Sequence, residues 1–368
     1  MHTSLSKYSR IIVKVGSALL TANGKRVDAA YVRRLAAQIA AVKTAERQVV
    51  VVSSGAIAAG MSRLGWKTRP TLRADLQVAA AVGQMRLMNI YEASFSRHGA
   101  HAAQILLSAE DMAHRTLYLN ARTTLKQIIA HGVIPVVNEN DVIATDDVSF
   151  GDNDRLAAQI ANLWEADLLL ILTNAPGLCR ENGEVVAQAS ANDDNLMNHV
   201  RSGDNRVGSG GMASKLSAAK IAARSGAHSF IVNGRAENCI ARVLNDEKNL
   251  GTFLAAEKTQ LSARKLWLAS GLNVRGKMIL DAGAARAVVR DKRSLLPAGV
   301  REVQGRFVRG DSVRLTDENK KAIGYALVNY DSKAAKRLCG VKSGEIFSIL
   351  GYMHEEEMAH RDNMTVLG

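Results

Sequence analysis

Cysteine, proline and aromatic residues are all scarce in this chain of 368 residues. Its three cysteines, Cys179, Cys239 and Cys339, lie far apart and form no CxxC pair, so neither a disulfide framework nor a zinc site is indicated. Such cysteine usage is typical of a reducing compartment, and we expect a cytoplasmic protein. The longest apolar run, Leu168 to Leu172, is too short to cross a bilayer, so no membrane partner is expected.

The remaining composition is that of an ordinary globular protein. Hydrophobic residues make up 47% and charged residues 23%, which excludes a disordered chain, a collagen and a coiled-coil rod. With 4% aromatic residues, the core must consist mainly of Ala, Val, Leu and Ile, as in helices packed on sheets. The length allows two or three domains.

The net charge of +13 favours anionic partners. Phosphorylated ligands, acidic metabolites and nucleic acid all fit this charge. A soluble surface rich in lysine and arginine gives the same total, so the charge alone leaves these alternatives open.

Short apolar runs alternate with helix-like segments over the first two thirds of the chain. Continuous apolar strands separated by helices predict an open, mostly parallel sheet sandwiched by helices, an α/β fold. The predicted strands are 11–15, 48–52, 103–107, 133–137, 167–173 and 229–232, and the main predicted helices are 28–42, 74–97, 118–131, 156–165 and a helix after residue 211.

Near Ala256 the alternation of apolar runs and helix-like segments gives way to a basic stretch and then to short strand-like pieces, which predicts a second domain. We place a first, α/β domain at 1–257, a basic linker at 258–275 and a small β-rich domain at 276–368. The strand-like pieces of this domain are 277–280, 306–308, 312–315 and 326–330, separated by turns that contain glycine. Asp281 to Ala284 is expected to open a short helix.

Ligands bind at the carboxyl ends of the strands in parallel sheets, so the polar residues after each strand are the candidates for function. Lys14 lies within the apolar run 11–15 and is costly to bury without an anion, although it could also extend to the sheet edge. Gly16 follows and would let backbone N–H groups approach a ligand. The turn Ser53–Ile57 could bind an anion or be a plain capped turn.

Two polar segments suit a charged ligand. Asn138–Asp141 and Gly151–Arg155 are rich in carboxyl and amide groups, which would bind an ammonium group or magnesium, or orient a lysine. The segment Gly208–Lys215 precedes a predicted helix and resembles a phosphate cradle. It is not a Walker A loop, because the chain contains no GK[ST] sequence.

These residue types suit phosphoryl transfer, which requires alignment of two substrates and positive charge on the transferring oxygens. A carboxylate acceptor would need no general base, in agreement with the scattered histidines. GxSxG and HExxH motifs are absent from the chain.

In this order, the segments 12–17, 53–60, 138–141, 151–154 and 210–215 resemble the glutamate 5-kinases of the amino-acid kinase family. The part from Gly276 to Glu356, with its turns at 294–300 and 307–311, resembles a PUA domain. The resemblance implies the transfer of phosphate from ATP, with Mg²⁺, to the γ-carboxylate of L-glutamate, which is the first step of proline biosynthesis. It also implies a dimer or tetramer and feedback inhibition by proline, with segment 107–112 near both glutamate and proline.

The resemblance also implies a role for each matching residue. The catalytic residues would be Lys14, Lys215, Asp154 and Gly16, with the lysines on the transferring phosphoryl group and Asp154 holding them. Glutamate would bind Ser54, Asp141 and Asn153. Nucleotide would bind Lys14, Thr173, Asn174, Ser209, Gly210, Gly211, Met212, Ala213, Ser214 and Lys215.

The sequence departs from the family pattern on the nucleotide side. Asn174 replaces the usual aspartate, and residues 179–182 replace a Tyr and an Asp-Pro-Arg segment. Two alternative functions are kept. One is a family member with another carboxylate or carbamate acceptor. The other is an RNA-binding or regulatory protein that would use the basic residues of the second domain, Lys320, Lys321, Lys333, Lys336, Arg337 and Lys342, with Tyr325, Tyr330 and Phe347 for stacking.

Overall fold

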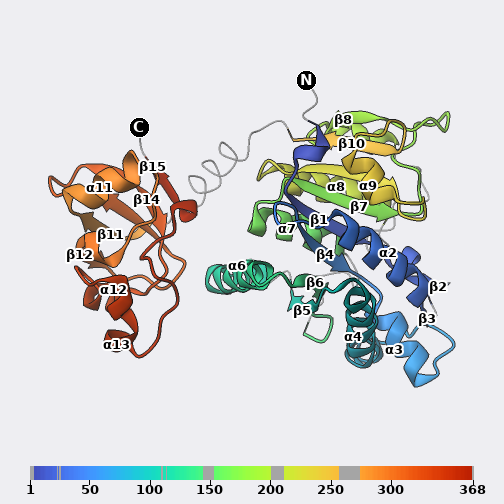
Figure 1. Cartoon of the computed structure of the whole chain (residues 1–368), viewed down its shortest axis with the longest axis horizontal. Coiled ribbons are helices and arrows are strands. Elements are labelled where there is room, and N and C mark those ends of the chain that lie inside the picture. Colours follow the sequence, from blue (N-terminus) through green and yellow to red (C-terminus); the bar gives the residue numbers. More distant parts are fainter. Residues whose placement is uncertain are drawn as a thin grey trace. The chain divides into compact units, whose positions relative to one another are not determined.

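The computed structural model describes residues 4–22, 24, 26–108, 111–112, 114–143, 153–199, 211–256 and 274–366. Two compact units are present. The first comprises residues 1–113 and 120–263, and the second residues 114–119 and 264–368 (Figure 1). Strand β11 begins at Val274, two residues before the predicted start of the second domain.

An eight-stranded sheet forms the centre of the first unit, in the order β5-β6-β4-β1-β7-β9-β10-β8. The pairs from β5 to β9 are all parallel, β10 is antiparallel to β9, and β8 pairs with β10. The strands are β1 (Arg10–Val15), β4 (Gln48–Ser53), β5 (Ala102–Leu107), β6 (Ile134–Glu139), β7 (Leu168–Thr173), β8 (Gln188–Ser190), β9 (His228–Asn233) and β10 (Gly251–Ala255). The predicted parallel sheet is confirmed.

Helices cover both faces of this sheet (Figure 1). On one face, the Ile11, Val13 and Val15 side chains of β1 share a core with α2, α4 and α9. The opposite face packs against α7 and α8. The helices of this unit are α1 (Ser17–Leu20), α2 (Ala29–Val42), α3 (Ala56–Leu64), α4 (Arg73–Phe95), α7 (Asn153–Trp164), α8 (Met212–Ala223) and α9 (Cys239–Leu244). A hairpin is formed by β2 (Thr21–Ala22) and β3 (Arg26–Val27). Helix α6 (Arg115–Ala130) begins in segment 114–119, which is assigned to the second unit, and its remaining residues are assigned to the first.

Helices α3 and α4 approach each other closely beside the sheet. Helices α3 and α4 cross at Gly60 and Gly83, where a Cβ atom would lie 1.7 Å from the Ala79 carbonyl oxygen and 1.8 Å from the Ala56 carbonyl oxygen, respectively. Only glycine leaves room for this contact. The backbones of α3 and α4 therefore touch, and the two helices are held as a pair.

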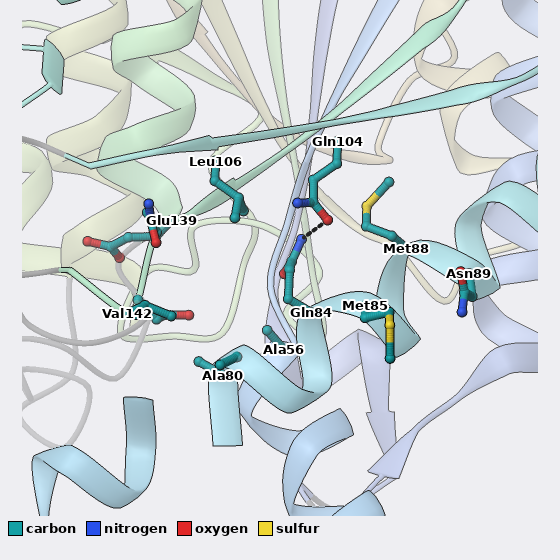
Figure 2. A pocket seen from close by; sticks show the side chains of 13 residues that line it. Ala56, Ala80, Gln84, Met85, Met88, Asn89, Gln104, Leu106, Glu139 and Val142 are labelled. Atoms are coloured by element: carbon teal, nitrogen blue, oxygen red, sulfur yellow. Dashed lines mark hydrogen bonds between the residues drawn. The ribbon is translucent and has the colours of Figure 1, made fainter. Parts of the chain in front are cut away.

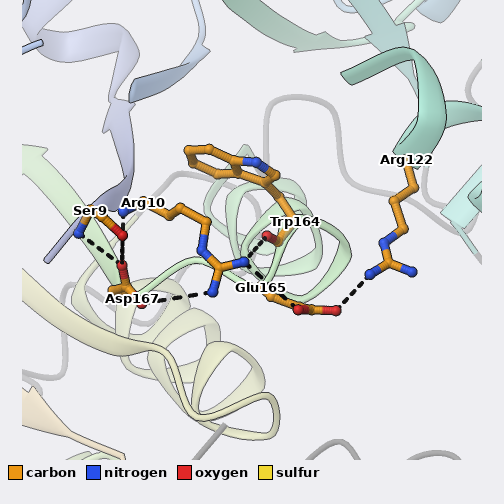
Figure 3. A network of polar contacts seen from close by, with 6 residues as sticks. All are labelled: Ser9, Arg10, Arg122, Trp164, Glu165 and Asp167. Carbon is orange, nitrogen blue, oxygen red and sulfur yellow. Dashed lines mark hydrogen bonds and ion pairs between the residues drawn. The ribbon is translucent and has the colours of Figure 1, made fainter. Parts of the chain in front are cut away.

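A polar network anchors the end of the sheet where β1 and β7 begin (Figure 3). The Asp167 carboxylate accepts hydrogen bonds from the Ser9 N–H, the Ser9 hydroxyl and the Arg10 N–H at 2.9, 3.1 and 2.8 Å. Glu165 accepts from Arg122 of α6 at 2.6 Å and lies 3.7 Å from the Arg10 guanidinium. The start of β1 is therefore held in place by these contacts, and Lys14 lies near the opposite end of the same strand.

The second unit has its own five-stranded sheet, in the order β12-β11-β13-β14-β15. Strands β11 and β13 are parallel and the other pairs are antiparallel. Its elements are β11 (Val274–Leu280), α11 (Ala282–Val289), β12 (Val300–Gly305), β13 (Ser312–Thr316), β14 (Ala322–Leu327), α12 (Ser332–Arg337), α13 (Ile346–Leu350) and β15 (Met364–Val366). Asp281 caps α11 by accepting from the Ala284 N–H, as expected from the sequence.

Two strand predictions in this unit are wrong. Residues 306–308 are not a strand, because β12 ends at Gly305, where the backbone takes a φ of +94°. The buried Phe307 belongs to the core although it lies in the loop after β12, so its apolar character reflects burial and not a strand. Strand β14 ends at Leu327, before the predicted end at 330.

Candidate active site

A buried carboxylate holds two buried lysines at the carboxyl ends of the central strands. Lys14 Nζ lies 2.5 Å from Asp154 Oδ1, and Lys215 Nζ lies 3.3 Å from Asp154 Oδ2. The exposed fractions are 3% for Lys14, 0% for Asp154 and 5% for Lys215. One buried carboxylate therefore contacts both ammonium groups.

Three separate elements bring these side chains together. Along β1, Ile11, Val13 and Val15 face the α2 side, so the alternation of a strand turns Lys14 toward α7 and α8. Asp154 lies in the first turn of α7 and Lys215 in the first turn of α8. The helix predicted over 156–165 begins three residues earlier than expected, since α7 starts at Asn153.

Asp154 is held in its charged form. Burial alone would raise the pKa of this carboxyl, but the Lys14 and Lys215 ammonium groups and the Ser214 hydroxyl hold its pKa below the usual value. Ser214 donates to Asp154 Oδ2 at 2.7 Å. The Asp154 carboxylate is therefore available to hold both lysines.

Gly16 leaves open space beside the first lysine. A Cβ atom at Gly16 would lie 3.8 Å from Lys14 Nζ and 3.8 Å from the Leu172 carbonyl oxygen. A side chain at position 16 would therefore occupy space next to the Lys14 ammonium group. A ligand that binds the two lysines needs this space.

A chain of amide side chains connects the lysine centre to the neighbouring helices. Asn153 Nδ2 donates to Ser54 Oγ at 2.9 Å and to Asn138 Oδ1 at 3.1 Å. Asn138 Nδ2 donates to Gln84 Oε1 at 2.9 Å, and Gln84 Nε2 donates to Gln104 Oε1 at 3.3 Å. Because Asn153 directly precedes Asp154, these hydrogen bonds hold the start of α7 next to the two lysines.

The amide chain contains residues that sequence reasoning missed. Gln84 lies in the middle of α4 and Gln104 in the middle of β5, away from any motif. Asn138 belongs to a polar segment noted in the sequence but was not assigned to the site. In the sequence, only the position of Gln84 within an apolar stretch of α4 indicates such a role.

A cavity of about 550 Å³ adjoins this chain. Helix α4 forms one wall with Gln84, Met85 and Met88, and strands β5 and β6 with the residues after them form the other (Figure 2). Gln84 and Gln104 meet across it. The full lining is Ala56, Ala80, Ala81, Gln84, Met85, Met88, Asn89, Gln104, Leu106, Glu139, Asn140, Asp141 and Val142.

Asp141 presents an unpartnered carboxylate oxygen to this cavity. The residue is 8% exposed, and its Oδ1 atom has no hydrogen-bond partner among the described residues. Burial raises the pKa of Asp141 to about 6, against a lowering effect of Arg69. Asn153 Oδ1 is also buried and without a partner among the described residues. Both oxygens are acceptors that suit a donor group such as an ammonium.

The predicted nucleotide residues divide into three groups. Thr173 and Asn174 lie at the end of β7, beside β1 in the sheet. Gly211 precedes α8, and Met212, Ala213, Ser214 and Lys215 form its first turn. Ser209 and Gly210 lie outside the described residues. Of segment 107–112, Ala109 and Glu110 also lie outside them, and Ser108 and Asp111 hydrogen-bond each other beyond β5.

The chain is similar to known proteins over its whole length. The amino acid kinase family model matches residues 9–233, and the PUA domain model matches residues 276–350. The chain therefore belongs to the amino acid kinase family, and within it to the glutamate 5-kinases, which it matches over its full length. It is 48% identical to glutamate 5-kinase of Pseudomonas syringae pv. syringae and 46% identical to that of Pseudomonas putida strain GB-1, covering 100% of each chain.

Two further matches complete the comparison. The chain is 47% identical to glutamate 5-kinase of Thioalkalivibrio sulfidiphilus, over 99% of this chain and 98% of the relative. A solved structure, carbamate kinase from Giardia lamblia bound to AMP-PNP, matches with a TM-score of 0.48 and 15% identity, covering 68% of this chain and 99% of that one.

The described part of the second unit exposes one of the three residues predicted to stack on RNA bases. Of the three predicted stacking residues, Tyr330 is 1% exposed and its hydroxyl bonds the Glu355 carbonyl oxygen, so that prediction is wrong. The Tyr325 ring is half-buried, with the Arg314 guanidinium 5.9 Å from its centroid. Phe347 alone of the three is exposed. Among the described residues, every helix is too short or too polar to span a bilayer.

Proposed function

We propose that this protein transfers the γ-phosphoryl group of ATP to the γ-carboxylate of L-glutamate, giving γ-glutamyl phosphate and ADP. This reaction opens proline biosynthesis. The full-length identity to three glutamate 5-kinases supports the reaction, and the two lysines on Asp154 supply charge of the sign that it needs. This three-residue centre is the observation on which the proposal rests.

Lys14 and Lys215 act on the transferring phosphoryl group. Negative charge spreads over its oxygens in the transition state, and two buried ammonium groups stabilise that charge strongly because little water screens them. Asp154 acts as a positioning residue, since it fixes both ammonium groups by contacts of 2.5 and 3.3 Å. Gly16 would keep the space beside Lys14 open for the phosphate oxygens.

The acceptor site uses the neighbouring polar groups. Asp141 would bind the α-ammonium of glutamate, and Ser54 and Asn153 would orient the substrate toward the lysines. The γ-carboxylate is already ionised at neutral pH and attacks directly, so no residue has to remove a proton. The free acceptor oxygens of Asp141 and Asn153 favour a free amino group over an acylated one.

The nucleotide would lie along Thr173, Asn174 and residues 209–215, with Lys14 and Lys215 at its γ-phosphate. Magnesium is expected with ATP, but Asp154 is already bound by two lysines, and the described residues contain no group of three potential metal-ligating His, Cys, Asp or Glu side chains. The described residues thus do not fit a protein-held magnesium site, and we assign no step to one. The triphosphate itself offers the oxygen ligands that magnesium prefers.

The other proposals come from the family. They are proline as feedback inhibitor, assembly into a dimer or tetramer, a cytoplasmic location, and the division into a kinase domain at 1–257, a linker at 258–275 and a PUA domain at 276–368. The matches at 9–233 and 276–350 support the division.

An acceptor panel tests the proposal. ADP release is measured with L-glutamate, N-acetylglutamate, aspartate and carbamate, each with and without proline, and the acyl phosphate is trapped with hydroxylamine. We expect ADP release and hydroxamate formation with glutamate well above the other acceptors. Preference for N-acetylglutamate would show that Asp141 does not bind a free ammonium, and ADP release with no acceptor preference would reject the acceptor site.

A further inference from the structure

Arg235 follows β9 at the carboxyl edge of the sheet, next to the end of β7. The backbone before it is fixed on two sides. The Gly234 N–H donates to the Thr173 carbonyl oxygen at 2.8 Å, and the Tyr31 hydroxyl donates to the Gly234 carbonyl oxygen at 3.1 Å. The Arg235 side chain therefore starts from a defined position between β7 and α2.

The guanidinium of Arg235 connects the ends of three strands. Its Nε donates to Asn174 Oδ1 at 3.2 Å, just after β7, and its Nη2 donates to the Ala18 carbonyl oxygen at 3.3 Å, just after β1. Its central carbon lies 6.0 Å from the centroid of the Tyr31 ring. Both acceptors are neutral, so these two bonds orient the guanidinium without cancelling its charge.

This contact determines which atoms Asn174 offers to a ligand. A guanidinium can only donate, so the side-chain atom of Asn174 that faces Arg235 must be the oxygen. The amide NH₂ group consequently points away from Arg235. Since Asn174 is exposed at the edge where parallel sheets bind ligands, it offers a neutral hydrogen-bond donor there.

We propose that Arg235 is a positioning residue for the phosphate donor. It fixes the Asn174 amide so that Nδ2 donates to an oxygen of the bound nucleotide. The proposal rests on the ATP-dependent function above and adds a specificity determinant to the nucleotide site, carried by a residue that no motif of the sequence singled out.

A double-mutant cycle tests this role. KM for ATP, KM for glutamate and kcat are measured for Arg235→Ala, Asn174→Ala and the double variant. Each single change should raise KM for ATP about threefold to tenfold, the effect of one lost hydrogen bond, with KM for glutamate and kcat near their original values. Because Arg235 acts through Asn174, the double variant should match Asn174→Ala alone.

Two further variants sharpen the test. Arg34→Ala is the matched control, because Arg34 is also exposed and lies 5.8 Å from the Tyr31 ring, so its removal should leave KM for ATP unchanged. Asn174→Asp keeps an acceptor for Arg235 but replaces the outward donor with an oxygen. It should raise KM for ATP. Because aspartate is the usual residue here in the family pattern, an unchanged KM for ATP in this variant would show that the outward group need not be a donor and would overturn the role given to Asn174 Nδ2.

Two further outcomes overturn the proposal. One is an unchanged KM for ATP in Arg235→Ala, and the other is a double variant in which the two effects add in full, which would mean that Arg235 acts independently of Asn174. Calorimetric titration of ATP into the same variants repeats the cycle without any acceptor. An incorrect glutamate assignment therefore leaves this test intact, whereas absence of ATP binding by the unmodified protein would reject the proposed function itself.

Discussion

At the scale of single residues, the site consists of charges that the fold has removed from water. Lys14, Asp154 and Lys215 are each at most 5% exposed. A buried ion pair does little for stability on balance, because desolvation of the charges offsets their attraction. The burial of two lysines around this carboxylate therefore suggests function rather than stability, since buried ammonium groups can strongly stabilise the charge of a bound anion.

Removing either lysine should reduce turnover much more than substrate binding. We expect Lys14→Ala and Lys215→Ala each to lower kcat about 10²- to 10³-fold, as the loss of one transition-state contact does in other enzymes. The measurement is kcat by coupled ADP release. Lys220→Ala is the matched control, because Lys220 lies on the same helix as Lys215 but is exposed and paired with Asp194 at 2.6 Å. Near-normal turnover in both site variants would reject the assignment.

Binding of glutamate should depend on pH through Asp141. The pKa of its carboxyl is raised to about 6 by burial, so the free protein carries a neutral Asp141 below that pH and a carboxylate above it. Only the carboxylate attracts an ammonium. We therefore expect kcat/KM for glutamate to fall about tenfold per pH unit as the pH drops below 6. The carboxyl groups of the substrate stay ionised down to about pH 5, so they do not cause a fall between pH 6 and pH 5.

The pH profile has an internal control. In Asp141→Asn the group no longer titrates, so kcat/KM for glutamate should be low and flat between pH 5 and 7. KM for ATP should not follow the same titration. A profile that bends at the same pH in Asp141→Asn would show that another group is responsible.

At the scale of elements, the substrate site depends on how α3 and α4 pack. The turn with Ser54 begins α3, and Gln84 of the amide chain lies on α4. The contact at Gly60 and Gly83 fixes the distance between these two helices. Gln84 bonds Asn138 and Ser54 bonds Asn153, so the packing contact between the two helix backbones helps to orient both asparagines.

Gly83→Ala should separate the two helices. The added Cβ would lie 1.8 Å from the Ala56 carbonyl oxygen and 2.3 Å from the Gly60 nitrogen, so the backbones must move apart. We expect a loss of at least about 2 kcal/mol in the free energy of unfolding, measured by urea denaturation, and a raised KM for glutamate. Gly344→Ala is the control, because a Cβ there meets no atom within 4 Å. Equal stability of the two variants would contradict this account.

The sequence predicted the strands of the sheet better than the amide chain. Continuous runs such as 48–52 and 167–173 are apolar on both faces, a pattern that follows directly from burial within a parallel sheet. Strands β8 and β10 were missed, because β8 has three residues and β10 is antiparallel at the edge. Gln84 and Gln104 were missed because their meeting depends on tertiary packing, which no local pattern encodes. The start of α7 was predicted three residues too late, since polar residues in the first turn of a helix look like a turn.

At the scale of the whole molecule, the described candidate residues all belong to one compact unit. Lys14, Asp154, Lys215 and the amide chain lie within the first unit, and the second unit has a separate apolar core around Met278, Val313 and Leu338. The net charge of +13 suits the two anionic substrates, ATP and glutamate.

A chain lacking residues 258–368 should keep the reaction. We expect it to bind ATP and to phosphorylate glutamate with kcat within a few-fold of the full chain, because no candidate site residue lies in the second unit or in its segment 114–119. A thermal melt shows whether the shortened chain is folded. A folded but inactive shortened chain would mean that the second unit contributes to the site.

The most direct measurement of the central claim is a crystal structure with glutamate and a non-hydrolysable ATP analogue. The account predicts Lys14 Nζ and Lys215 Nζ at hydrogen-bond distance, about 2.7–3.2 Å, from oxygens around the γ-phosphate, with Asp154 still bound to both ammonium groups. Ammonium groups that point away from the triphosphate, with the glutamate γ-carboxylate elsewhere, would contradict it.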